Sequence, residues 1–247
     1  MEKWRLISDP PLPGEINMER DLQIMQEVSS GQAPPTLRFY RWSPPALSLG
    51  FSQNVEKVAD PDACRRLNID IVRRPTGGRA VLHHRELTYS ITVPEDHRLI
   101  PRGIIASYKF LSQGLLSAFK LLNIEASLAH GSKRGRKPVP GACFDSSSAY
   151  EIQVKGKKVI GSAQLRRGGV LLQHGSILLE LSADLYYQIL KKPERKIKAA
   201  AYLRLLQRSA AGLLDLGYRL DERDLEKALV SGFSQLFGAE LREKEFV

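Results

Sequence analysis

The sequence predicts an α+β fold in which helices flank a mixed β-sheet. Two observations support this class. Short segments rich in β-branched and aromatic residues alternate with longer segments whose apolar residues recur at helical spacing. The last three segments are all helical in pattern, and we find no internal repeat or low-complexity block. A chain of 247 residues can bury about three quarters of its unfolded surface, so we expect a single domain over residues 1–247.

The first part of the chain contains one longer helical pattern and several strand patterns. The amphipathic helix is expected from about Ile16 to Val28. The turn Ser43-Pro44-Pro45 should join the next two strands as a hairpin-like pair, and Asp60 should cap a short helix that contains a buried Cys64. The remaining expected elements are strands at Thr36–Trp42, Ala46–Gly50, Ile69–Arg73 and Leu87–Val93, and the short helix at Pro61–Leu67.

The second part begins with the longest helical pattern, from Ile104 to Leu122. A hairpin should turn around Lys155-Gly156-Lys157. Its strands are expected at Tyr150–Val154 and Lys158–Ala163, followed by a strand at Gly169–Leu181 and helices at Ala183–Lys191, Ala199–Leu216 and Asp221–Phe237.

The charge balance favours an acidic macromolecular partner. Lysine and arginine number 37 against 27 aspartate and glutamate, a formal charge of +10. One dense basic run, residues 131–138, lies just before Cys143 and is expected to be a loop beside the active site. The charge is equally compatible with cations spread over solvated faces.

The sequence lacks the patterns of membrane, disulfide-linked and metal-binding proteins. The N-terminal region has prolines and charges in place of an apolar signal segment, and no stretch approaches the roughly 18 apolar residues of a membrane span. The two cysteines, Cys64 and Cys143, show no metal-ligand spacing. We therefore expect a cytoplasmic protein with free thiols, no metal and no membrane association.

Cys143 and a cation in the lysine-containing run Val154–Gln164 form the most informative pair in the sequence. A thiol at its ordinary pKa of about 8.5 is only about 3% ionised at pH 7. A cation about 4 Å away, at an effective dielectric constant near 20, stabilises a thiolate by about 4 kcal/mol, whereas lowering the thiol pKa by two units needs about 2.7 kcal/mol. Because nucleophilicity falls with the pKa, the net gain is only about 3-fold, so the cation should also help to move protons. The pair predicts a cysteine-dependent acyl transferase.

A glycine turn forms a second candidate site. Arg74, Gly77, Gly78 and Arg79 place backbone donors and cations where one anionic or carbonyl-bearing ligand could meet them. Paired glycines between strands are also typical of an ordinary tight turn or bulge. Backbone amides at Gly77-Gly78 or at Gly161-Ser162 could hold an oxyanion, and the sequence does not decide between them.

Three histidines accompany these segments. His83 and His84 are adjacent on a strand, so their side chains point to opposite faces and cannot chelate one ion. His174 lies in Gln173-His174-Gly175, where a histidine either orders a strand or takes part in catalysis.

Taken together and in order, these motifs resemble the biotin/lipoate protein ligase superfamily. Within it, the likeness is greatest to the cysteine-dependent octanoyltransferases of lipoate biosynthesis in Gram-positive bacteria. The likeness extends from about Trp4 to Leu190. The motifs that carry it are Leu37–Trp42, Arg73–Arg79, His83 to Ser90, Cys143–Asp145, Tyr150-Glu151, Gly156–Gln164 and Gln173–Leu179.

The resemblance implies a ligase-like catalytic core at about residues 32–247 that transfers an octanoyl group from octanoyl-acyl carrier protein to a lipoyl-domain lysine. The typical acceptor is the glycine cleavage H protein. Cys143 would be the acyl-thioester nucleophile and Lys158 the residue that lowers its pKa. Both donor and intermediate are thioesters, so no ATP, metal or other cofactor is expected beyond the phosphopantetheine arm of the carrier protein. A monomer is expected. The implied substrate-binding residues are Arg74, Gly77, Gly78, Arg79, His83, Gly161, Ser162 and His174.

Three alternatives remain at this point. ATP-dependent lipoate-protein ligases usually carry a third glycine where this chain has Arg79, and the lipoyl-domain amidotransferases also use a cysteine. Family members often have aspartate where this chain has His84, which leaves the role of that position open. A nucleic-acid-binding regulator would use the basic run, but no helix-turn-helix precedes the domain and no aromatic residues interleave with the run.

Overall fold

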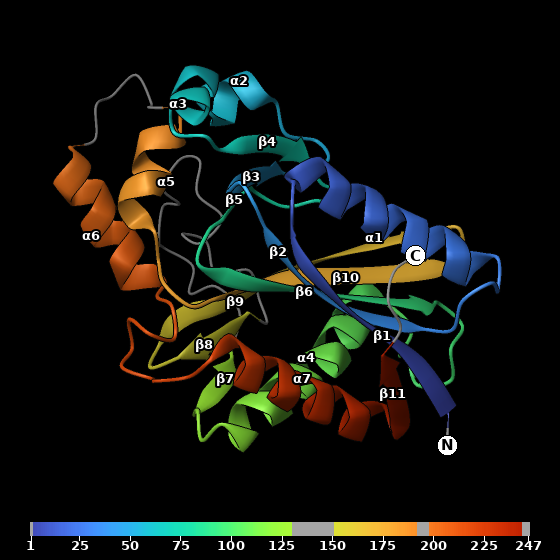
Figure 1. Cartoon of the computed structure of the whole chain (residues 1–247). Coiled ribbons are helices and arrows are strands. Elements are labelled where there is room, and N and C mark those ends of the chain that lie inside the picture. Colours follow the sequence, from blue (N-terminus) through green and yellow to red (C-terminus); the bar gives the residue numbers. More distant parts are fainter. Residues whose placement is uncertain (1, 130–150, 192–197, 244–247) are drawn as a thin grey trace.

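The computed structural model describes residues 2–129, 151–191 and 198–243. Two β-sheets organise these residues (Figure 1). The strands are β1 (Glu2–Leu12), β2 (Thr36–Trp42), β3 (Ala46–Leu49), β4 (Asp70–Arg73), β5 (Val81–His83), β6 (Glu86–Pro94), β7 (Ala126–Leu128), β8 (Ile152–Val154), β9 (Lys157–Arg167), β10 (Val170–Leu178) and β11 (Ala239–Glu243). The larger sheet has the order β11-β1-β2-β6-β10-β9-β8-β7, and the smaller has the order β4-β3-β5.

Helices cover both faces of the larger sheet (Figure 1). On one face, α4 (Ile104–Leu121) and α7 (Glu222–Phe237) pack together over the largest hydrophobic cluster. On the other face, α1 (Gly14–Ser29) packs through Ile24, Met25 and Val28 against β10. Because both faces are covered, the central strand β10 is buried along its whole length.

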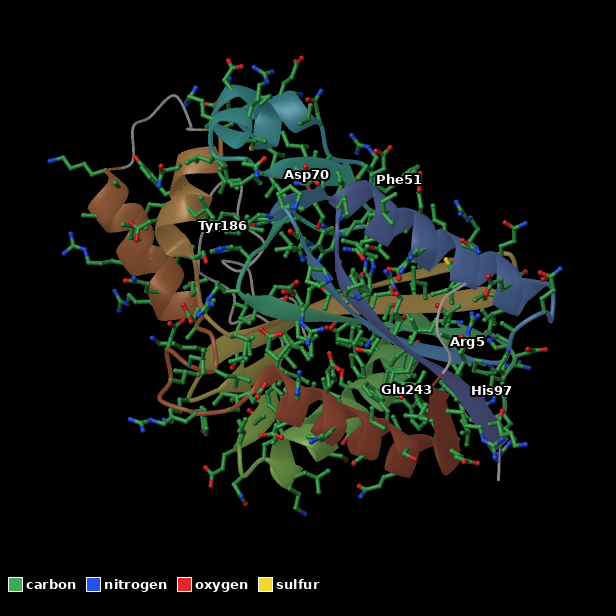
Figure 2. All side chains as sticks on the ribbon, viewed as in Figure 1. Arg5, Phe51, Asp70, His97, Tyr186 and Glu243 are labelled. Carbon is green, nitrogen blue, oxygen red and sulfur yellow. The ribbon has the colours of Figure 1, made fainter. Side chains whose placement is uncertain are left out.

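The smaller sheet packs against four helices on one side of the molecule (Figure 1). They are α2 (Val55–Val58), α3 (Pro61–Arg66), α5 (Ala183–Ile189) and α6 (Ala199–Ser209). Cys64 lies in the hydrophobic core between the smaller sheet and these helices and is 1% exposed, as predicted. Asp70 of β4 accepts a hydrogen bond from the Gly14 amide (3.2 Å), which ties the smaller sheet to the start of α1 (Figure 2).

The α+β class and most of the expected elements are confirmed. The Asp60 side chain accepts a hydrogen bond from the Ala63 amide (3.0 Å) and so caps α3 as predicted. The hairpin β8–β9 turns at Lys155 and Gly156, both of which have positive φ angles. Helix α6 is shorter than expected, since it ends at Ser209 and the chain becomes extended at Ala210.

The expected hairpin between β2 and β3 is wrong. Both edges of β2 are already occupied, by β1 and by β6, so no edge remains for β3. After Trp42 the chain leaves the larger sheet, and β3 pairs instead with β4 and β5 in the smaller sheet. The two strands therefore bring residues from different sheets toward one site.

Three short or irregular strands were not predicted. β1 contains Pro10 and Pro11, which argue against a regular strand, and the β1–β2 register shifts between Ser8 and Pro11. The other two, β7 and β11, have only three and five residues, too few for an alternating pattern to stand out. The strand expected at His83 is confirmed as β5, which ends at His83 and does not include His84.

Several predictions lie outside the described residues. These are Cys143, the basic run at residues 131–138 and the start of the expected strand at Tyr150. No helix in the described ranges is both long and apolar enough to cross a membrane. The same ranges contain no group of three or more His, Cys, Asp or Glu side chains arranged to hold a metal ion.

Candidate active site

A cavity of about 170 Å³ lies where β9 and β10 of the larger sheet face the smaller sheet and the turn after β4. It brings together Lys158 and seven of the eight predicted substrate-binding residues, whereas Gly77 is not part of its lining. The lining residues are Met18, Tyr40, Trp42, Ser48, Arg74, Gly78, Arg79, Val81, His83, Thr88, Glu151, Lys158, Gly161, Ser162, Ala163, His174, Gly175 and Ser176.

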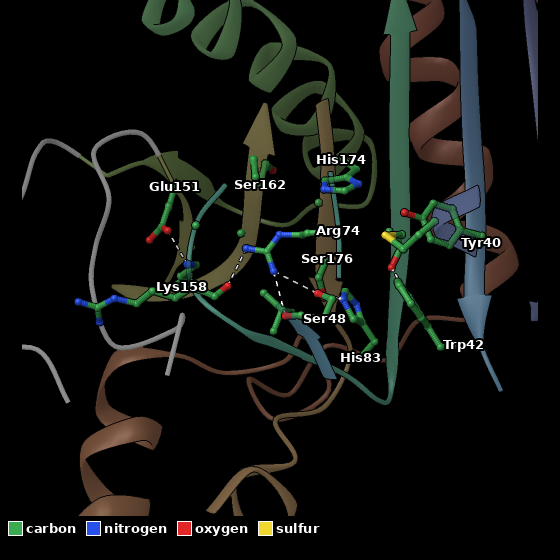
Figure 3. A pocket seen from close by; sticks show the side chains of 18 residues that line it. Tyr40, Trp42, Ser48, Arg74, His83, Glu151, Lys158, Ser162, His174 and Ser176 are labelled. Atoms are coloured by element: carbon green, nitrogen blue, oxygen red, sulfur yellow. Dashed lines mark hydrogen bonds and ion pairs between the residues drawn. The ribbon is translucent and has the colours of Figure 1, made fainter. Parts of the chain in front are cut away.

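Lys158 forms an ion pair with Glu151 at one side of this cavity (Figure 3). The Lys158 Nζ donates to Glu151 Oε1, and the two side chains are only 3% and 4% exposed. Lys158 is opposite Gln153 in the β8–β9 hairpin, and the register shift between Ile152 and Gln153 accompanies the approach of the two side chains. The backbone of Lys158 is also fixed, because its carbonyl accepts a hydrogen bond from the Ala211 amide (3.1 Å).

Arg74 organises the glycine turn from inside. Its Nη2 donates to the carbonyls of Gly77 (2.8 Å) and Arg79 (2.7 Å), and its Nη1 donates to the Ser48 carbonyl (3.0 Å). In Figure 3, Arg74 lies between Lys158 on one side and Tyr40 and Trp42 on the other. These contacts show that the Arg74 guanidinium shapes the cavity wall by binding the protein's own backbone.

The two glycines of the turn differ in what they require. Gly78 has a φ of +96°, and a Cβ atom there would lie 2.9 Å from Arg74 Nη2. A Cβ atom at Gly77 would meet nothing within 4 Å, and Gly77 has an ordinary backbone conformation. Only Gly78 therefore needs to be glycine for the turn to form.

His83 and His84 point to opposite sides of β5 and the chain that follows, as predicted. His83 Nε2 is 2.8 Å from Ser48 Oγ, and its ring stacks on Trp42 with a centroid distance of 3.9 Å. Burial lowers the pKa of His83 below its usual value, and the nearby Arg74 adds to this effect, although Glu86 opposes it. The His84 ring lies away from the cavity, with Nδ1 2.6 Å from Ser182 Oγ.

A buried charge network supports the floor of the site. Arg38 and Asp21 are fully buried, and Arg38 Nη1 donates to Asp21 Oδ1 (2.8 Å) while Arg38 Nε donates to Asp9 Oδ2 (2.7 Å). The Tyr40 hydroxyl donates to Asp21 Oδ2 (3.0 Å). Burial opposes ionisation of Asp21, but Arg38 and His174 outweigh it and hold its pKa below the usual value. Asp21 is therefore an ionised hydrogen-bond acceptor.

His174 connects this network to the glycine turn. Its Nδ1 is 3.1 Å from Asp21 Oδ2, and its Nε2 is 2.7 Å from Thr76 Oγ1. Both ring nitrogens are thus bound by the protein itself. Of the two roles considered for His174, the geometry favours ordering the structure.

Gly175 makes room for the polar group opposite it. A Cβ atom on Gly175 would lie 2.4 Å from Ser162 Oγ and 2.7 Å from Tyr89 Cε1. The Ser162 hydroxyl is 2.8 Å from the Tyr89 hydroxyl, and burial raises the pKa of Tyr89 to about 12. Tyr89 is therefore a neutral hydrogen-bonding group at physiological pH.

Sequence comparison identifies the family that this architecture belongs to. The family model described as the lipoyl protein ligase A/B catalytic domain matches residues 13–234. The chain belongs to this family.

Two curated relatives and one solved structure illustrate the family likeness. The chain is 41% identical over 245 residues to "Octanoyltransferase LipM" of Clostridioides difficile, covering 98% of this chain and 90% of the relative. It is 46% identical over 203 residues to the protein of the same name from Brevibacillus brevis, covering 80% and 74%. The fold is similar to a bi-partite lipoate protein ligase from Thermoplasma acidophilum, with a TM-score of 0.80, 23% identity and coverage of 100% and 88%.

In this member of the lipoyl protein ligase A/B family, three site residues were not assigned a role from sequence. Glu151 and Thr76 were noted only as parts of motifs, and Asp21 was not singled out. Asp21 and the lining residue Met18 are on α1, which precedes residue 32, where the catalytic core was expected to begin. Charged or hydroxyl residues on helix and turn patterns are usually solvent-exposed, so only the tertiary contacts reveal these roles.

Proposed function

We propose that this protein transfers an octanoyl group from octanoyl-acyl carrier protein, through a thioester on Cys143, to a lysine of a lipoyl domain. The acceptor in this proposal is the glycine cleavage H protein or another lipoyl-domain protein, and the enzyme acts in the cytoplasm as a monomer. Octanoyl transfer in lipoate biosynthesis is the activity that the curated relatives support, since several that carry the octanoyltransferase name are about 41% identical over nearly the whole chain. That near-complete match is the observation that carries the proposal.

The reaction that we propose has two acyl-transfer steps. The Cys143 sulfur attacks the thioester carbonyl, a new C–S bond forms, and the bond to the pantetheine sulfur breaks. The released pantetheine sulfur takes up the proton that Cys143 gave up. The ε-amine of the acceptor lysine then attacks the Cys143 thioester and loses one proton as the amide forms, and the Cys143 sulfur leaves and regains a proton. The first step converts one thioester into another and is nearly balanced in free energy. The second step converts a thioester into a more stable amide and is therefore favourable.

Lys158 serves this chemistry as a charged group in the wall of the cavity. The sequence indicated an isolated cation, whereas Lys158 forms an ion pair with Glu151 in the structure. The carboxylate offsets part of the field that Lys158 exerts on a nearby thiolate, so the full stabilisation of about 4 kcal/mol is an upper bound. This makes proton transfer and orientation a larger part of the role that we propose for Lys158.

The proposal requires neither ATP nor a metal, because the acyl group arrives as an activated thioester. Arg79 occupies the position where the ATP-dependent ligases usually have a third glycine, and it lines the cavity. The curated relatives reported above carry the octanoyltransferase name, which favours transfer over ligation.

The deciding experiment uses the purified full-length protein with octanoyl-acyl carrier protein and no nucleotide. We expect a mass increase of one octanoyl group, located on the peptide that contains Cys143. Adding apo H protein should then discharge the enzyme and octanoylate the acceptor lysine. A Cys143→Ala protein that still modifies the acceptor would overturn the proposed intermediate.

Two further reactions separate the alternatives. Free octanoate with ATP would modify the acceptor if the protein were a ligase, and octanoylated H protein would serve as the donor if it were an amidotransferase. We expect octanoyl-acyl carrier protein to be the preferred donor of the three.

A further inference from the structure

A line of hydrogen bonds runs from helix α1 to the glycine turn at the cavity. Asp21 on α1 contacts His174 on β10, and His174 contacts Thr76 in the turn, at 3.1 Å and 2.7 Å. Thr76 is fully buried, and its hydroxyl also accepts a hydrogen bond from Arg74 Nε (3.2 Å). The Thr76 carbonyl accepts a hydrogen bond from the Phe51 amide (2.9 Å), which fixes the peptide on its other side.

The chemistry of the groups at the two ends, Asp21 and Arg74, determines which group donates each hydrogen bond. The Asp21 carboxylate can only accept, so His174 Nδ1 must carry the proton that it donates. In a neutral ring, His174 Nε2 is then the acceptor, and the Thr76 hydroxyl donates to it. This leaves the Thr76 oxygen lone pairs to accept from Arg74 Nε. Each hydroxyl and ring proton along the line is thus assigned by the groups beside it.

The turn that Thr76 anchors presents its peptide groups in a defined orientation. The carbonyls of Gly77 and Arg79 both point at Arg74 Nη2. In a trans peptide the following N–H points the opposite way, so the Gly78 amide faces away from the guanidinium. No group in the described part of the chain accepts a hydrogen bond from that amide, and Gly78 lines the cavity.

We propose that Thr76 is a positioning residue that, through His174 and Asp21, holds the Gly78 amide ready to bind the carbonyl oxygen of the reacting acyl group. This inference rests on the proposed acyl transfer. Of the two segments that the sequence left open as oxyanion donors, Gly77-Gly78 and Gly161-Ser162, it chooses the first and assigns the donor to the Gly78 amide. A fixed donor is worth more than a flexible one, because no reorganisation is needed as charge develops on the oxygen.

The test compares Thr76→Val, which keeps the shape and removes the hydroxyl, with Thr76→Ser, which keeps the hydroxyl. We expect Thr76→Val to lower kcat about 10- to 100-fold with KM for octanoyl-acyl carrier protein changed less than about 3-fold. Thr76→Ser should remain within about 3-fold of the wild-type kcat. A purely structural role would lower the thermal midpoint and the active fraction of Thr76→Val, but active-site titration would return the wild-type kcat for each active molecule. That result would overturn the proposal, as would equal losses in both variants.

A second readout does not depend on turnover. Nitrogen-15 NMR of histidine-labelled protein, with the His174 signals assigned by their loss in His174→Gln, reports which ring nitrogen carries the proton. In the wild-type protein we expect the Nδ1–H form. In Thr76→Val, the chemical shift of Nε2 should move toward the value of a ring nitrogen that accepts no hydrogen bond. An Nε2–H form would contradict the proposed direction. Failure of the wild-type protein to transfer octanoate would instead count against the proposed function, whatever the NMR result.

Discussion

The Lys158 ammonium is bound by the Glu151 carboxylate within the cavity wall, with side chains that are 3% and 4% exposed. Two charges this deeply buried have lost most of their hydration, and each compensates the other. The pair is consequently both a structural element of the β8–β9 hairpin and, in the function that we propose, a part of the reacting site.

Replacing one member of this pair should destabilise the fold more than replacing both. Lys158→Met leaves a carboxylate buried beside an apolar side chain, so we expect a loss of about 3 kcal/mol or more in the free energy of unfolding. The double variant Lys158→Met/Glu151→Leu removes both charges and should recover most of that loss. Urea unfolding of the three proteins measures the difference.

Activity separates the structural role of the pair from its chemical one. Both variants should lose acyl transfer, because neither retains the ammonium that we assign to proton transfer. If the stabilised double variant regained wild-type turnover, Lys158 would have no role beyond stability.

The neighbouring glycines of the turn should respond differently to the same substitution. Gly78→Ala forces an alanine into a positive φ, at about 1 to 2 kcal/mol, and places its Cβ against Arg74 Nη2. That nitrogen is already held by two carbonyls and cannot move without breaking them. Gly77→Ala meets neither obstacle and serves as the matched control. Thermal unfolding should show a lowered midpoint for Gly78→Ala alone, and equal midpoints would contradict the role of the turn conformation.

The extent to which the sequence predicted the fold follows from the range of the interactions involved. The helix α4 and the hairpin β8–β9 depend on local periodicity and turn chemistry, and both were found where expected. The pairing of β2 could not be deduced locally, because its neighbours β1 and β6 are held by contacts across long stretches of chain. A strand pattern indicates that a strand exists, but not which edge it occupies.

The same distinction applies to the candidate site. The sequence motifs predicted that Lys158, Arg79 and His174 belong to one site, and all three line the cavity. The sequence could not show that the Arg74 guanidinium binds backbone carbonyls, nor that Glu151 neutralises Lys158. Both facts depend on which polar side chains become buried together, and a single sequence carries no signal for that pairing.

The burial of His83 predicts a pH dependence of stability. Its pKa is lowered from 6.5, chiefly by burial, so the unfolded chain takes up a proton more readily than the folded one. The free energy of unfolding should therefore fall as the pH drops below about 6.5, toward the lower pKa of the folded state. Urea midpoints between about pH 7.5 and pH 5.5 should decline more steeply for the wild-type protein than for His83→Gln. Parallel declines would mean that other groups account for the acid sensitivity.

Cys64 should be chemically silent in the folded protein. It is 1% exposed in the core beneath the smaller sheet, and burial, aided by Asp60, raises the pKa of its thiol to about 11. Since the thiolate is the reactive form, very little Cys64 reacts at about pH 8 while the fold is intact. We expect iodoacetamide followed by peptide mass spectrometry to leave Cys64 unmodified in native protein and to modify it fully in urea. Cys64→Ala should still form the octanoyl thioester on Cys143. Loss of acylation in that variant would contradict the assignment of Cys143 as the nucleophile and point to Cys64.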